Sequence, residues 1–392
     1  MFQQAVRLTP DGHLERAGRL YDLRKSLTDR FQKLRDINDI NESLLVFQQA
    51  VQLTPDEHSK KPIRFTHLGN SHQARFEQLG DLDDLNQSVI LHEKAAKLAP
   101  DSHPDKPGAF KGLGNSLMLR FQRLGDLGDL NKSISMFQRA AELIPDDNRT
   151  RPALLNNLAN SLVCRFGWLG DHDDINEAAL KFEQAAILMP DSNLFKPAVL
   201  SGLGNSLSHR FEQMENPVGI EKSIWASRQA LRLTPDGHPY KFAILHNLGR
   251  SLSNRFKHLR DPVDINESVM VYQQAVKLIP VHPSKPISFG NLGISLCYRF
   301  EQSKDLGDLN ESILMLQQAV KFTPDGHPDK PGYLCNLSGT LWARFQKLRN
   351  PDDHNQILSH YMSAACSSTG PASVRFHAAS RWAQVVKYAS DR

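Results

Sequence analysis

Apolar residues recur along this chain at helical spacing, in pairs of segments separated by short polar turns. Between Pro107 and Gly125 they occur at i, i+4, i+8 and i+11, which gathers them on one face of a helix; they are Leu113, Leu117, Phe121 and Leu124. A second segment, which Pro145 closes, repeats the pattern with Leu130, Ile134, Phe137 and Ala141. The pattern predicts two helices joined by a turn.

Aspartates indicate where the second helices begin. Asp129 directly precedes the second apolar stripe, where a carboxylate can cap the N–H groups of a helix end. Four other repeats have an aspartate followed three residues later by glutamate, a pattern typical of a capping box; the pairs are Asp39/Glu42, Asp174/Glu177, Asp264/Glu267 and Asp308/Glu311. We therefore predict that these aspartates are N-caps.

An Arg-Phe pair marks a repeat. The pairs begin at Arg30, Arg75, Arg120, Arg165, Arg210, Arg255, Arg299 and Arg344. They are 45 residues apart, except for one step of 44 that we assign to a residue missing from the loop at 280–283. A fixed period of this size is typical of stacked helical units, which bury their apolar stripes only against one another. The sequence predicts an all-α solenoid of about eight 45-residue helix-turn-helix repeats.

The period also suggests the domain organisation. We expect the array to cover residues 1–365 and to start in the middle of a repeat, because residues 2–6 match residues 47–51. Residues 366–392 are expected to form a degenerate helical segment, since the pair at Arg375 and Phe376 breaks the period.

The repeats resemble tetratricopeptide (TPR) repeats. The motif positions of that family appear in order as Leu113-Gly114, Leu117, Ser133, Phe137, Ala140 and Pro145, although the repeat is longer than the usual length of about 34 residues. The resemblance implies a right-handed α–α superhelix whose first helices line a concave groove. It also implies a non-enzymatic scaffold that binds a protein or peptide in that groove.

The repeat motif is similar to that of fungal TPR–CHAT proteins. It reads L-G-N-S-L-x-x-R-F-x-x-L-G-D-L-x-D-L-N-x-S-I and is followed by L-T-P-D-G-H-P. This resemblance implies that the chain is the recognition or regulatory arm of a CHAT-type protease. The alternative is a truncated or orphan array with a structural role in self-assembly.

Composition narrows the possible partners. The 47 basic and 43 acidic residues are mixed along the chain, without the basic stripe that nucleic-acid binding requires. No apolar run approaches the roughly 18 residues that cross a bilayer. We expect a cytoplasmic protein with a protein or peptide ligand and neither nucleic-acid nor membrane partners, and its oligomeric state stays open. The four cysteines form no C-x-x-C pair, which is typical of reduced thiols.

Repeated polar residues are the remaining candidates for chemistry. One loop histidine per repeat is too few for a metal site, so we assign these histidines to turns; they are His13, His58, His103, His238, His282 and His327. We assign a structural role to the recurring arginines Arg75, Arg120, Arg165, Arg210, Arg255 and Arg299, each expected to meet a carboxylate or carbonyl at the helix turn near residues such as Asp126. No phosphate loop or protease motif is found, so we predict neither a catalytic residue nor a cofactor.

A ladder of asparagines is the best candidate for binding. Asn70, Asn115, Asn160 and Asn205 lie two residues after a stripe leucine and so project away from the core. The TPR resemblance places them in the groove, where amides can hold a peptide backbone, and Lys111 is the nearby lysine that fits. The ladder stops at Arg250, Ile294 and Gly339, so the groove should change composition between the two halves.

Overall fold

The computed structural model describes residues 2–10, 13, 15–34, 36–214, 217–278 and 285–390, and within these ranges every regular element is an α-helix. The helices are α1 (Phe2–Arg7), α2 (Arg16–Leu34), α3 (Ile37–Gln52), α4 (Lys61–Leu79), α5 (Leu82–Leu98), α6 (Lys106–Leu124), α7 (Leu127–Leu143), α8 (Arg151–Leu169), α9 (His172–Leu188), α10 (Lys196–Met214), α11 (Pro217–Arg232), α12 (Lys241–Leu259), α13 (Pro262–Leu278), α14 (Lys285–Ser303), α15 (Leu306–Phe322), α16 (Lys330–Leu348), α17 (Pro351–Ala365) and α18 (Ala372–Ser390).

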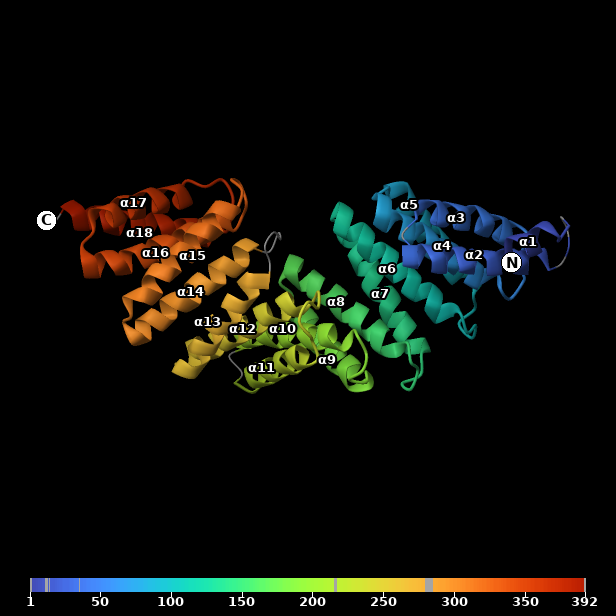
Figure 1. Cartoon of the computed structure of the whole chain (residues 1–392), viewed down its shortest axis with the longest axis horizontal. Coiled ribbons are helices and arrows are strands. Elements are labelled where there is room, and N and C mark those ends of the chain that lie inside the picture. Colours follow the sequence, from blue (N-terminus) through green and yellow to red (C-terminus); the bar gives the residue numbers. More distant parts are fainter. Residues whose placement is uncertain are drawn as a thin grey trace. The chain divides into compact units, whose positions relative to one another are not determined.

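First and second helices alternate along the chain. The first helices are the even-numbered helices from α2 to α16, and each packs on the second helix that follows it (Figure 1). Their starting residues are 45 apart, with 44 between α12 and α14. The predicted all-α array of helix-turn-helix repeats is confirmed. The loop at 280–283 lies outside the described residues.

The chain forms two compact units, an N-terminal unit of residues 1–189 and a C-terminal unit of residues 190–392. Within the C-terminal unit, α18 packs on α16 and α17, just as α6 packs on α4 and α5 in the N-terminal unit. The segment that follows residue 365 thus takes the place of a first helix. No described helix is both long enough and apolar enough to cross a membrane.

The helix ends agree only partly with the predictions. Gly125 ends α6 in the left-handed conformation, with a φ of 73° that glycine adopts without strain. However, α7 begins at Leu127, and Asp126 is its N-cap, accepting a hydrogen bond from the Gly128 N–H at 2.8 Å. The prediction that Asp129 is the cap is therefore wrong. The same correction applies to Asp39, Asp174, Asp264 and Asp308, which lie inside their helices.

Asp129 instead binds the repeated arginine. Arg120 Nε and Nη2 donate to the two carboxylate oxygens of Asp129 at 2.6 and 2.7 Å, and Asp129 is buried. The arginine therefore does meet a carboxylate, but one that lies three residues beyond Asp126. The same pairs form at Arg30–Asp39, Arg75–Asp84, Arg165–Asp174, Arg255–Asp264, Arg299–Asp308 and Arg344–Asp353.

The arginine also reaches the preceding repeat. Arg120 Nη1 donates to Asn86 Oδ1 on α5 at 3.3 Å, so one guanidinium joins α5, α6 and α7. Equivalent bonds join Arg75 to Asn41, Arg165 to Asn131 and Arg344 to Asn310, and Arg255 binds Glu221 at this position. We call the arginine and its aspartate, together with this third partner where there is one, the arginine clamp.

Arg210 is the exception. Gly219 occupies the position of the aspartate in its repeat, and Arg210 makes no hydrogen bond or ion pair among the residues that the structure describes. A Cβ added to Gly219 would meet no atom within 4 Å. The clamp is therefore incomplete in this repeat, although there is room to complete it.

The loop histidines order the turns between repeats. His103 Nδ1 accepts the Asp105 N–H at 3.2 Å, and His13, His58, His238 and His327 accept in the same way from the residue two positions later. Asn148 and Asn193 form this bond with their side-chain oxygens. His282 lies outside the described residues. Within the described ranges, no group of three potential metal ligands occurs.

Completing the clamp at Gly219 should stabilise the C-terminal unit. Gly219→Ala should raise the urea midpoint through helix propensity, worth about 1 kcal/mol. Gly219→Asp should raise it further, because a hydrogen bond to a charged group contributes about 1.5–3 kcal/mol. In an Arg210→Gln background, the advantage of aspartate over alanine should disappear. If aspartate is no better than alanine in the wild-type background, the clamp does not stabilise the repeat.

Candidate functional site

Three of the predicted groove residues line one hollow in the N-terminal unit. The hollow has a volume of about 500 Å³ and lies between α4, α6 and the loops before α6 and α8. Asn70 from α4 and Lys111 and Asn115 from α6 line it, together with Thr66 and His67. Apolar and loop residues complete the wall; they include Ile63, Pro104, Asp105, Pro107, Ile144 and Thr150. The structure thus brings two ladder asparagines and the lysine together.

His92 of α5 fixes the spacing of α4 and α6 beneath this hollow. Its ring lies against Gly69 of α4 and Gly112 of α6, where an added Cβ would come within 2.7 and 2.6 Å of the ring. Only glycine fits at this distance, so both helices approach the ring with bare backbone. In the repeats on either side, the same position carries Phe47 and Phe137.

The polar atoms of His92 are all used inside the protein. Nε2 lies 3.1 Å from both the Thr66 carbonyl oxygen and Asn70 Oδ1, and Nδ1 lies 3.0 Å from Ser116 Oγ. A carbonyl only accepts, so the ring carries its proton on Nε2. Burial lowers the pKa of His92 to about 4, against the weaker opposing effect of the Thr66 carbonyl. His92 is therefore a neutral imidazole that ties α5 to α4 and α6.

The hydrogen bonds of the two asparagines orient their amides. Asn70 Oδ1 receives the His92 N–H, and Asn115 Oδ1 accepts from Asn157 Nδ2 of α8 at 2.9 Å. Among the described residues, neither amide nitrogen has a partner, and Lys111 Nζ has none either. The hollow therefore offers hydrogen-bond donors and one positive charge to a ligand.

A second histidine contributes to the wall of the hollow. His67 Nδ1 lies 3.4 Å from Arg24 Nη2, and its ring makes an edge contact with Tyr21 at 5.7 Å. Burial, and then the nearby Arg24 charge, lower the pKa of His67 to about 4. His67 is therefore neutral, and the charged side chains that line this hollow are Lys111 and Asp105.

The other two ladder residues lie elsewhere. Asn160 is exposed on α8 and does not line the hollow. Asn205 belongs to the C-terminal unit, where its carbonyl oxygen accepts from Arg250 Nη2 at 3.3 Å. Arg250 stands at the ladder position of α12 and also contacts His209 Nε2 at 2.9 Å. In this unit the ladder position joins α10 to α12.

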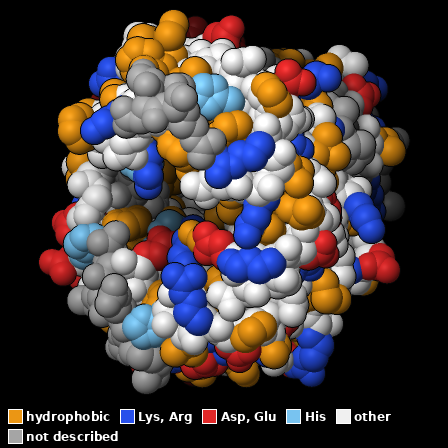
Figure 2. Space-filling model, turned by 90° about the vertical axis from the view of Figure 1, so that its left-hand side faces the viewer, with side chains coloured by type: hydrophobic (Ala, Val, Ile, Leu, Met, Phe, Trp, Pro, Cys, Tyr) orange, Lys and Arg blue, Asp and Glu red, His pale blue; other side chains and the backbone are white. Residues whose placement is uncertain are grey.

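Charged side chains on the surface are mixed in sign. On the face in Figure 2, several Lys and Arg side chains gather near the centre, with Asp, Glu and hydrophobic side chains among them. The recurring arginines of the sequence analysis belong to the clamps, apart from Arg210. They therefore lie at the turns between helices and not in the hollow.

Comparisons with known proteins give structural likenesses only. No protein-family model matches the chain, and no curated protein matches it. YrrB, described as a TPR protein with an unusual peptide-binding site, shares 16% identity over 60% of this chain and 93% of its own, with a TM-score of 0.40. A TPR protein from Parabacteroides merdae shares 10% identity over 78% of this chain and 96% of its own, with a TM-score of 0.48. A putative kinesin light chain with TPR-like repeats from Podospora anserina shares 14% identity over 57% of this chain and 99% of its own, with a TM-score of 0.40.

His92 should make stability depend on pH. An exposed histidine has a pKa of about 6.5, so between pH 6.5 and 4 the unfolded chain takes up a proton that folded His92 does not. The free energy of unfolding should therefore fall as the pH falls through this range.

His92→Phe, which copies the residue of the neighbouring repeats, should make that fall smaller. Urea titrations at several pH values measure it, and the carboxylates common to both proteins cancel in the difference. Parallel pH profiles for the two proteins would contradict the assigned role of His92.

Proposed function

We propose that this array is a non-enzymatic scaffold and that the hollow between α4 and α6 binds an extended, acidic segment of a partner protein. The observation that carries the proposal is the convergence of Asn70, Lys111 and Asn115 on one hollow. Their position at successive repeats suits a ligand that runs along the repeats.

The chemistry of the hollow supports this class of ligand. The two amide nitrogens can donate to backbone carbonyls, which every extended peptide presents in a row. Lys111 can attract a carboxylate, and the walls at Ile63 and Ile144 can contact an apolar side chain. An acidic peptide with an apolar residue nearby uses each of these features.

Reversing the charge of Lys111 should weaken peptide binding. Random peptides displayed on phage are selected against the immobilised chain, and the affinity of the enriched sequences is then measured by fluorescence anisotropy. Lys111→Glu should weaken binding of acidic peptides about tenfold, equivalent to about 1.4 kcal/mol, and should reduce its dependence on salt.

Lys97→Glu is the matched control for this experiment, since Lys97 is exposed on α5 and does not line the hollow. It makes the same change in net charge and should leave the affinity unchanged. If no peptide is enriched, or if both charge reversals weaken binding equally, the proposed site is wrong.

We further propose that the chain is the cytoplasmic recognition arm of a CHAT-type protease. This proposal is supported by the resemblance of the repeat motif to the repeats of fungal TPR–CHAT proteins. Sequencing the transcript beyond Arg392 tests it directly. A CHAT-like reading frame downstream is the expected result, and a stop codon directly after Arg392 contradicts the proposal.

A further inference from the structure

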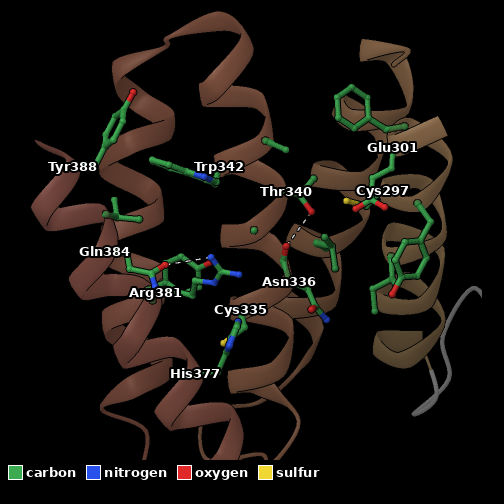
Figure 3. A pocket seen from close by; sticks show the side chains of 18 residues that line it. Cys297, Glu301, Cys335, Asn336, Thr340, Trp342, His377, Arg381, Gln384 and Tyr388 are labelled. Carbon is green, nitrogen blue, oxygen red and sulfur yellow. Dashed lines mark hydrogen bonds between the residues drawn. The ribbon is translucent and has the colours of Figure 1, made fainter. Parts of the chain in front are cut away.

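A second hollow, chemically different from the first, lies in the C-terminal unit. It has a volume of about 480 Å³ and is enclosed by α14, α16 and α18 (Figure 3). This volume falls within the range of about 300–1,000 Å³ that is typical of sites for small molecules. It shares no residue with the hollow between α4 and α6.

The ladder positions of α14 and α16 line this hollow. Ile294 on α14 and Gly339 on α16 stand where α4 and α6 carry asparagine, and both line the hollow. A Cβ added to Gly339 would meet only Tyr361 Oη, at 3.9 Å. The space that an asparagine side chain takes in other repeats is therefore empty here.

Aromatic and aliphatic groups form much of the wall. Trp342 lies at the side of the hollow and makes an edge contact with Tyr388 of α18, with ring centroids 5.2 Å apart. Leu316, Tyr361 and Val385 are buried beside it. Flat apolar surfaces of this kind favour an aromatic group of a ligand.

One positive charge faces this apolar space. Arg381 of α18 extends into the hollow, where its Nη1 donates to Gln384 Oε1 at 3.2 Å (Figure 3). Among the described residues Arg381 has no carboxylate partner. Glu301, which lies across the hollow on α14, is 4.0 Å from Arg260 instead. A guanidinium beside an apolar wall and without a paired carboxylate is suited to bind the carboxylate of a ligand.

We propose that this hollow is a binding site for a small aromatic carboxylate. The ring of the ligand lies over Gly339 and against Trp342, and its carboxylate accepts hydrogen bonds from Arg381. The site is independent of the peptide site proposed above, because it belongs to the other unit and uses different chemistry. Either proposal can fail without the other.

The probe for this site is 3-phenylpropionate, titrated into the full chain by isothermal titration calorimetry. We expect saturable binding with one ligand per chain. The neutral 3-phenylpropionamide, which has the same ring, should bind about tenfold more weakly because it lacks the charge that pairs with Arg381. Absence of saturable binding, or equal binding of acid and amide, would overturn the proposal.

Matched variants locate the binding. Gly339→Leu should fill the hollow and abolish binding, whereas Gly332→Leu, on the same helix in open space, should retain it. Arg381→Gln should weaken the acid about tenfold and make acid and amide bind alike, whereas Lys387→Gln on α18 should change neither. Circular dichroism confirms that each variant is folded. Binding that survives both Gly339→Leu and Arg381→Gln would falsify the site.

A peptide could offer the same chemical group at its end. Acetyl-Gly-Gly-Phe, which carries an aromatic ring next to a terminal carboxylate, is therefore titrated in parallel. Weaker binding of this peptide than of 3-phenylpropionate supports a site for a free small acid. Tighter binding of the peptide would overturn the assignment to a small molecule.

Discussion

The ion pair between the arginine of a first helix and the aspartate in the first turn of the following second helix is the interaction on which the described repeats depend, apart from the repeat of Arg210. The aspartate is buried inside its repeat, and a buried carboxylate without a partner would destabilise the fold by several kcal/mol, about 3–5. The arginine must therefore point to the turn, which fixes the two helices of a repeat. In five repeats a further N–H group of the arginine binds the preceding repeat, so the same residue also fixes the stacking, as Arg120 does between Asp129 and Asn86.

A fixed stacking leaves equivalent positions of the first helices free to vary in chemistry. The ladder position is asparagine at Asn70 and Asn115, arginine at Arg250 and glycine at Gly339. Since this position faces away from the apolar stripe, these changes do not disturb the core. They do change the chemistry of each stretch of the array: the first pair offers amide donors, Arg250 joins two helices, and Gly339 lines a hollow with both aromatic and charged walls. Variation at one repeated position thus accounts for two hollows of different composition in one array.

The sequence was sufficient to predict what depends on local pattern. The helices, their period and the glycine at the end of α6 follow from residues close together in the chain. The N-cap was misassigned because Asp126 and Asp129 are both aspartates near the helix start, and only the partner of Asp129 distinguishes them. That partner, Arg120, lies on another helix.

The role of His92 and the packing of α18 were missed for related reasons. The neighbouring repeats carry phenylalanine at the position of His92, so the sequence indicates an ordinary core residue there. The hydrogen-bond partners of His92 lie on α4 and α6, and the spacing of residues within α5 does not indicate them. The helix α18 lacks the repeat period, as Arg375 shows, yet it packs as a first helix because it has an apolar face of the right length. Arg381 lines the second hollow only because α18 packs on α16, and the sequence pattern of α18 does not indicate this packing.

The second hollow can exist because the fold does not need it filled. A glycine inside a helix costs about 1 kcal/mol relative to alanine, and Gly339 pays no further penalty, because its neighbours on the stripe remain buried, as Leu337 and Leu341 are. The clamp at Arg344 holds α16 and α17 together without any contribution from Gly339. The α16 wall of the hollow is therefore supported by contacts on the opposite side of that helix, so this wall does not depend on a ligand for its position.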